Sequence, residues 1–199
     1  MGAARLPVFD EQFFAGAWPS PGRDRLYFAI QPEPRVLDNI AGVTASLVKR
    51  HGLRGRPRPL DTLHISILGV GLDEAISPEQ MAIAAEAARR VAFRPFALTL
   101  SEAVSIRRWD GNALVLRCGE GSDTVTDLAH ALFDRMLDGG HTPRGTADVR
   151  PYLTLLHDSV EVPPTRLAWP IQLDVTRFSL IRSQSARGRF ERESFPLHD

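Results

Sequence analysis

A histidine and a serine stand two positions apart in an otherwise apolar run, Leu63-His64-Ile65-Ser66-Ile67-Leu68. The run predicts a β-strand in which Thr62, His64 and Ser66 share one face, with Cα atoms about 6.6–6.8 Å apart from one to the next. An imidazole with a pKa near about 6.5 transfers protons at neutral pH, and a neighbouring hydroxyl can bind a phosphate oxygen. This strand face therefore predicts one half of a site that contacts a phosphoester.

A second segment, Pro151-Tyr152-Leu153-Thr154-Leu155-Leu156, repeats the pattern of a ring-bearing residue followed two positions later by a hydroxyl. By the same alternation, Arg150, Tyr152 and Thr154 share a face. If the two strands flank one groove, these side chains meet the polar face of the first strand across it. The hydroxyls and Arg150 would then bind the non-bridging oxygens of a phosphate, because a guanidinium suits planar, bidentate contact.

A purely structural interpretation stays open at this point. A histidine in a strand is often a structural residue whose hydrogen bonds are satisfied within the fold, or a surface residue. Two apolar strands can also share such a pattern by chance. Ser66 and Thr154 could be ordinary strand hydroxyls, and Tyr152 an ordinary core aromatic.

A basic run before the first strand consists of Arg50, Arg54, Arg56 and Arg58. It is either a solvated loop or a rim that attracts an RNA end or a nucleotide.

The spacing of apolar residues predicts the helices and strands that must position these residues. Apolar residues at helical spacing predict helices at 33–50, from Ser77 onward, and at 122–137. Ser77, Pro78 and Gln80 form a capping-box pattern at the start of the second helix. Strand-like runs lie at 25–30, 60–68, 95–107, 113–118, 147–156, 171–181 and 189–195. Since strands and helices do not alternate strictly, we expect an α+β fold with mainly antiparallel sheets.

Two glycine-containing segments predict changes of direction. Asp110-Gly111, between two strand-like runs, is a hairpin signal. Gly69-Val70-Gly71, directly after the first polar strand, is interpreted as a turn.

Length and net charge indicate the overall organisation of the chain. The chain has 199 residues and zero formal net charge, so it predicts one buried domain, or two small lobes that share a core. We expect residues 1–24 to form an N-terminal arm and residues 25–199 to form a single two-lobed domain. Nothing in the total charge demands a long nucleic-acid track or a membrane surface.

Cys118 is the only cysteine, which excludes an intrachain disulfide and fits a reducing compartment. The N-terminal segment does not resemble a signal peptide, and no apolar run is long enough to span a membrane. We therefore expect a cytoplasmic protein. The histidines show no metal-ligand spacing, and there is no glycine-rich phosphate loop, so we expect neither a metal nor a cofactor.

At its two polar strands the sequence resembles the two-histidine phosphoesterase superfamily, specifically its bacterial 2'-5' RNA ligase and RNA 2',3'-cyclic phosphodiesterase branch. That family carries two His-x-Thr/Ser motifs on strands that flank a central groove, and the first is intact as His64-Ile65-Ser66. Segments 25–30 and 178–183 are similar to its first and penultimate strands, so the resemblance spans about residues 25–197. It implies two pseudo-symmetric lobes of mainly antiparallel sheet, with helices on the outer faces and a central groove.

The second motif departs from the family pattern, because Tyr152 stands where the family has histidine, whereas Thr154 is in place. The family's reaction needs one group that accepts a proton and one that donates it. A tyrosine with a pKa near about 10 stays protonated at pH 7 and is a poor base. The resemblance therefore implies His64 as base and Tyr152 as proton donor, with substrate bound by Ser66, Thr154 and Arg150.

Two further histidines could supply a second ring. His157 lies five positions beyond Tyr152, and an odd offset places it on the opposite strand face unless a bulge intervenes. His141 lies in a loop that no spacing places at the groove.

Two functions remain open. The first is a metal-independent enzyme that acts on a 2',3'-cyclic phosphate or a 2'-5' phosphodiester. The alternative is a catalytically impaired module of the same fold that binds a phosphate, a nucleotide or an RNA end. Both imply a nucleotide cyclic phosphate or an RNA terminus as partner, and we expect a monomer without membrane contact.

Overall fold

The computed structural model describes residues 24–73, 76–108, 111–184 and 189–199. The predicted arm lies outside these residues except for Asp24, which begins the first strand. The strands are β1 (Asp24–Ile30), β2 (Ile65–Asp73), β3 (Phe96–Arg108), β4 (Gly111–Cys118), β5 (Tyr152–Asp158), β6 (Thr165–Val175), β7 (Arg177–Gln184) and β8 (Arg189–Pro196). The helices are α1 (Pro34–His51), α2 (Pro78–Arg89) and α3 (Ser122–Asp138), with a 3-10 turn at Leu60–Thr62.

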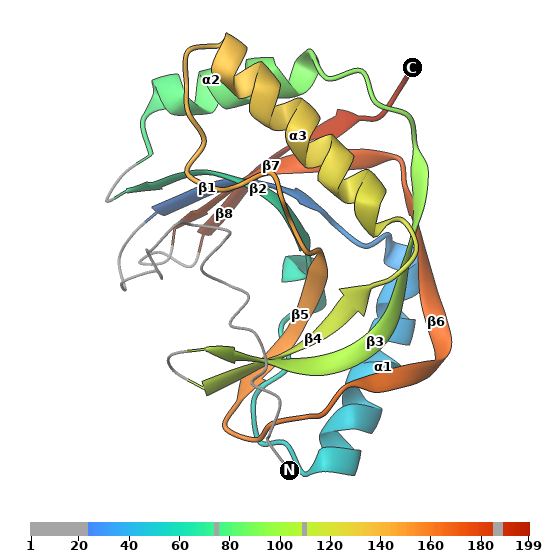
Figure 1. Ribbon diagram of the computed structural model, residues 1–199. Coiled ribbons are helices and arrows are strands. Elements are labelled where there is room, and N and C mark those ends of the chain that lie inside the picture. Colours follow the sequence, from blue (N-terminus) through green and yellow to red (C-terminus); the bar gives the residue numbers. More distant parts are fainter. Residues whose placement is uncertain (1–23, 74–75, 109–110, 185–188) are drawn as a thin grey trace, which may run out of the picture.

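The strands form one sheet of eight, in the order β6-β3-β4-β5-β2-β1-β7-β8, and all the neighbouring strands are antiparallel. Two halves of four strands meet where β5 lies beside β2. Among the described residues, this junction is a single pair, Ile65 with Leu153. Figure 1 shows the two halves curving toward each other, with the helices on their outer sides. The predicted α+β fold of two antiparallel lobes with outer helices is confirmed.

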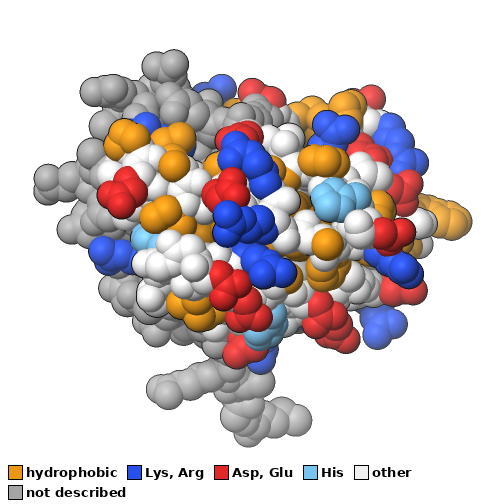
Figure 2. All heavy atoms as spheres, turned by 90° about the horizontal axis from the view of Figure 1, so that it is seen from above, with side chains coloured by type: hydrophobic (Ala, Val, Ile, Leu, Met, Phe, Trp, Pro, Cys, Tyr) orange, Lys and Arg blue, Asp and Glu red, His pale blue; other side chains and the backbone are white. Residues whose placement is uncertain are grey.

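Each half is covered by a helix that follows a strand of the other half. α1 follows β1 but packs near β6, whereas α3 follows β4 and packs on β2 beside α2 (Figure 1). The helices bury apolar stripes against the sheet, such as Val36, Ile40 and Leu47 of α1. Figure 2 shows acidic and basic side chains intermixed over the outer face formed by α2 and α3, as expected for solvated helix surfaces.

The helix predictions are confirmed to within one or two residues. The Ser77 hydroxyl accepts the backbone N–H of Gln80 at 3.1 Å, and the Gln80 side chain accepts the N–H of Ser77 at 3.0 Å. This is the predicted capping box. In the described part of the chain, no helix is long and apolar enough to cross a membrane.

Two strand predictions need correction. Leu60–Thr62 forms a 3-10 turn, in which the Thr62 hydroxyl donates to the Pro59 carbonyl, so Thr62 does not share a strand face with His64. Gly69-Val70-Gly71 is not a turn but part of β2, because its backbone pairs with β1.

The other strand predictions hold in part. The predicted run 171–181 is not one strand but the end of β6 and the start of β7, which are separated at Thr176. β5 begins only at Tyr152, so the predicted run from 147 starts too early. β3 and β4 form the predicted hairpin, with Arg108 paired to Gly111, and Asp110 of its turn lies outside the described residues.

Candidate active site

The junction of the two half-sheets sets which way the candidate residues face. Ile65 and Leu153 are fully buried in the core under the helices, and side chains alternate along each strand. The residues before and after this pair therefore face the opposite side, toward which the two half-sheets curve (Figure 1) and which is called the groove below. When the antiparallel register of this pair is extended by one residue in each direction, His64 lies beside Thr154 and Ser66 lies beside Tyr152. Side chains so paired have Cβ atoms about 4.5–5.5 Å apart.

His64 lies directly before β2, and a hydrogen bond to the backbone of Thr62 orients its ring. Its Nδ1 lies 2.8 Å from the carbonyl oxygen of Thr62, and a carbonyl only accepts, so the proton of the neutral ring is on Nδ1. The ring packs against Tyr27 of β1, with centroids 5.2 Å apart. Nε2 therefore carries the lone pair.

Burial lowers the pKa of His64 to about 4, and the Thr62 carbonyl partly opposes this shift. The positive charges of Arg58 and Arg25 lower the pKa further. The ring is therefore neutral at pH 7 and has the protonation state of a general base.

Tyr152 lies on β5 next to an apolar patch of β3 and β4. Arg108 Nη2 donates a hydrogen bond of 3.1 Å to its phenol oxygen. Burial raises the pKa of Tyr152, whereas Arg108 and Arg58 act in the opposite direction. The phenol is therefore protonated at neutral pH and has the state of a hydrogen-bond or proton donor.

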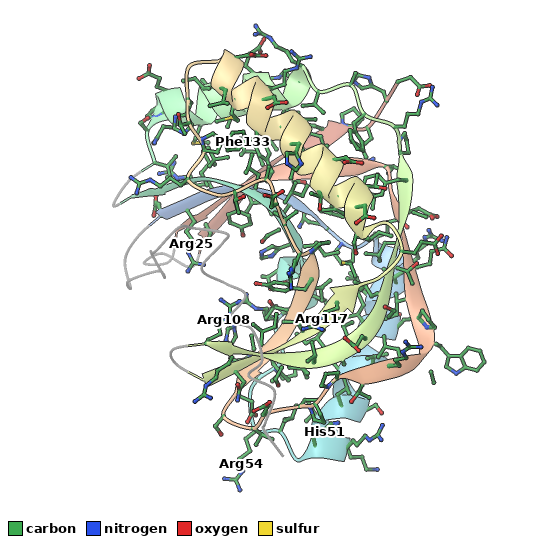
Figure 3. All side chains as sticks on the ribbon, viewed as in Figure 1. Arg25, His51, Arg54, Arg108, Arg117 and Phe133 are labelled. Carbon is green, nitrogen blue, oxygen red and sulfur yellow. The ribbon has the colours of Figure 1, made fainter. Side chains whose placement is uncertain are left out.

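Three arginines surround these two residues: Arg25, Arg58 and Arg108. Arg58 belongs to the basic run for which a solvated loop or a rim was predicted, whereas no site role was predicted for Arg25 and Arg108. Figure 3 shows Arg25 and Arg108 reaching from the two half-sheets into the space between them. Burial lowers the pKa of Arg25 and of Arg58, and the Nε atom of each is buried without a hydrogen-bond partner among the described residues. For Arg25 a signal was present, because Arg25 and Tyr27 alternate with the apolar residues of β1.

Arg58 reaches the groove because its loop is fastened to β5. The Asp158 carboxylate accepts the backbone N–H groups of Arg54 and Gly55, each at 2.6 Å. The N–H of Arg58 donates to the Leu155 carbonyl at 2.8 Å. Of the basic run, Arg50, Arg54 and Arg56 are exposed, and Figure 3 shows Arg54 pointing away from the groove. Only Arg58 of this run therefore belongs to the site.

His157 faces the groove, although its odd offset from Tyr152 predicts the opposite. The pairing of β4 with β5 shifts by one residue around Leu155, so that Thr154 pairs with Val115 and His157 pairs with Ala113. This bulge reverses the alternation, so His157 returns to the face of Thr154. Its Nε2 lies 3.4 Å from Arg58 Nη2.

The remaining predicted residues lie further out. Arg150 is exposed just before β5 and lines a cavity of about 310 Å³ with Tyr152 and Arg117. The His141 ring is 3.3 Å from the carbonyl oxygen of Val70, well along β2 from the junction. Among the described residues, no group of three or more His, Cys, Asp or Glu side chains is arranged to hold a metal ion.

Comparisons with known proteins agree with this geometry. The family model of the 2'-5' RNA ligase superfamily matches residues 32–187. Escherichia coli LigT complexed with 3'-AMP is 26% identical over 89% of this chain and 99% of that chain, with a TM-score of 0.66. LigT complexed with phosphate is 26% identical with the same coverage and a TM-score of 0.65.

TT0787 of Thermus thermophilus is 19% identical over 87% of this chain and 97% of that chain, with a TM-score of 0.68, and it supports the fold alone. A comparison with curated protein sequences gives no match. Because the family model covers most of the chain, the protein belongs to the 2'-5' RNA ligase superfamily, and this membership supports a two-histidine phosphoesterase-type function, that of a phosphodiesterase or RNA ligase-like protein.

Proposed function

We propose that the protein hydrolyses a 2',3'-cyclic phosphate or a 2'-5' phosphodiester of a nucleotide or RNA end, with His64 as base and Tyr152 as proton donor. The observation that carries this proposal is the placement of His64, directly before β2, and of Tyr152, on β5, on the groove side of the junction between these strands. Burial there lowers the pKa of the imidazole and raises the pKa of the phenol. Similarity to LigT, which has been solved with 3'-AMP and with phosphate, supports a nucleotide phosphate as ligand.

In the proposed reaction, His64 Nε2 takes a proton from water as the water oxygen attacks phosphorus. The bond from phosphorus to one ribose oxygen breaks, and Tyr152 gives its proton to that oxygen, which leaves a phosphomonoester and a free hydroxyl. The imidazolium and the phenolate then return to their neutral forms through solvent. No metal takes part in these steps.

The surrounding residues hold the phosphate in this proposal. Ser66 and Thr154 donate hydrogen bonds to its non-bridging oxygens, and Arg58 stabilises the negative charge that develops on them. Arg108 stabilises the phenolate through the bond that it already makes to Tyr152. Arg150, at the rim, binds a more distant part of the substrate.

One observation favours a second function, a binding module with impaired catalysis. Burial raises the pKa of Tyr152, which makes the phenol a weaker acid than an imidazolium in the same place. Holding a phosphate or a nucleotide needs only the hydroxyls and the arginines.

Hydrolysis of nucleoside 2',3'-cyclic phosphates by the purified protein tests the proposal. We expect turnover that His64→Ala lowers by about 10²–10⁴-fold, the usual contribution of a general acid–base group. His141→Ala is the matched control, because that histidine lies away from the groove. Turnover unaffected by His64→Ala would contradict the catalytic assignment. An inactive wild type with activity gained in Tyr152→His would establish the binding module instead.

A further inference from the structure

The groove holds more positive charge than the proposed reaction needs. Arg25, Arg58 and Arg108 surround the reacting pair, and His64 is neutral there. Within the described parts of the chain, no carboxylate pairs with Arg25 or Arg58. A 2',3'-cyclic phosphate carries a single negative charge, so it matches only one of the two guanidinium groups of Arg25 and Arg58.

This concentration of positive charge is costly. A buried charge is stable only when it is paired, and burial lowers the pKa of both Arg25 and Arg58. Arg58 also repels Arg25 and lowers its pKa further. A ligand with more than one negative charge would relieve both effects.

The arginines divide into two groups by position. Arg58 acts electrostatically on both His64 and Tyr152, and Arg108 donates to Tyr152, so these two lie with the reacting phosphate. Arg25 acts on His64 but is not among the groups that shift the pKa of Tyr152. It lies on the His64 side of the groove, two residues along β1 from Tyr27, a Cα separation of about 6.7 Å.

We propose that Arg25 binds a second phosphate of the substrate, beside the one that reacts. This inference rests on the proposed function and narrows its substrate class. The substrate is a 2',3'-cyclic phosphate whose nucleoside carries a further phosphate, as in an RNA end or a 5'-phosphorylated nucleotide, rather than a nucleoside cyclic phosphate alone. Arg25 suits this role because a guanidinium binds phosphate through two parallel hydrogen bonds.

The test compares adenosine 2',3'-cyclic phosphate with its 5'-phosphorylated counterpart. We expect kcat/KM to be about ten- to hundredfold higher for the second compound, mainly through KM, as for the loss of one charge-assisted contact. Arg25→Gln should abolish this advantage, so that the variant hydrolyses the two compounds with equal kcat/KM. Arg25→Lys, which keeps the charge, should restore part of it. Arg94→Gln is the control, because this exposed arginine pairs with Asp199 outside the groove.

The outcomes separate this inference from the proposed function. Hydrolysis of both compounds at equal kcat/KM by the wild type, or an equal loss for both in Arg25→Gln, overturns the second phosphate site and leaves the phosphodiesterase standing. Absence of hydrolysis for both overturns the proposed function, and calorimetry then tests the inference directly. Adenosine 2',5'-bisphosphate should bind at least about tenfold more tightly than adenosine 2'-phosphate, and Arg25→Gln should remove the difference. Equal dissociation constants overturn the inference.

Discussion

In the proposed reaction, His64 and Tyr152 take opposite roles for one physical reason. Burial disfavours the charged form of any group, so it lowers the pKa of an imidazole and raises the pKa of a phenol. Both effects occur here, at His64 and at Tyr152. Each group is consequently neutral at pH 7, which leaves His64 able to accept a proton and Tyr152 able to donate one.

The lowered pKa of His64 predicts how activity depends on pH. A free enzyme whose base has a pKa of about 4, instead of 6.5, keeps that base deprotonated throughout mildly acidic solution. We expect kcat/KM for a cyclic phosphate to stay level as the pH falls through 6.5 and to decline only toward about pH 4. The measurement is a pH profile of kcat/KM. An acid limb between about pH 6 and 7 would show that His64 has an ordinary pKa, or that another group is the base.

The phenol of Tyr152 can be tested by removing one atom. Tyr152→Phe keeps the ring against the apolar patch of Val104, Ile106, Ala113 and Val115 but removes the hydroxyl. If the phenol donates a proton, kcat should fall by about 10²–10⁴-fold while KM changes little. Steady-state kinetics on a cyclic phosphate give both parameters. An unchanged kcat would exclude Tyr152 as donor and would leave it a packing role.

Among the elements, the loop after α1 brings a distant arginine into the site. Backbone hydrogen bonds to Asp158 and Leu155 hold this loop against β5, and Arg58 at its end is close enough to His64 and Tyr152 to lower the pKa of both. The bulge at Leu155 acts at the same place, because it turns His157 toward Arg58. One short stretch of β5 thus positions two basic side chains.

Gly55 is the point at which this loop approaches β5 most closely. A Cβ atom there would collide with the carbonyl oxygen of His157, whereas a Cβ at Gly42 of α1 meets no atom within 4 Å. We expect Gly55→Ala to destabilise the protein by about 1–3 kcal/mol and to lower kcat/KM, because Arg58 moves with the loop. Gly42→Ala should stabilise the helix by up to about 1 kcal/mol without changing kcat/KM. Urea unfolding and steady-state kinetics check both variants, and equal effects of the two would refute this role of the loop.

At the scale of the whole molecule, the site lies where the two half-sheets meet. Among the described residues, only Ile65 and Leu153 pair across this junction, and the groove residues lie directly on either side of them. Helices α1 and α3 each pack on the half that does not contain the strand before them, so neither half buries its apolar face with its own helices alone. The halves should therefore depend on each other for stability.

This dependence predicts that residues 25–199 unfold as one unit, in agreement with the proposed single domain. We expect far-UV and near-UV circular dichroism to report the same urea midpoint. Leu153→Ala, which opens a cavity at the junction, should lower the stability by about 2–5 kcal/mol and keep the two transitions coincident. Two separate midpoints in either protein would show that the halves fold independently.

The sequence by itself determined the features that depend on neighbouring residues. Alternation along a strand sets the facing of Ser66 and of Thr154, and local hydrogen bonding sets the capping box at Ser77. The α+β class followed from the order of the helix and strand patterns, and the family resemblance, which the family model confirms, added the two-lobed arrangement. These features need no knowledge of what lies across the sheet.

Only the tertiary structure decided which basic side chains lie at the candidate site. Arg25, Arg58 and Arg108 come from two strands and a loop that are distant in sequence, and His157 faces the groove only because β5 bulges against β4. Pairing with β1 likewise made Gly69–Gly71 a strand instead of a turn. Such outcomes depend on contacts between segments far apart in the chain, and these contacts cannot be predicted from local periodicity.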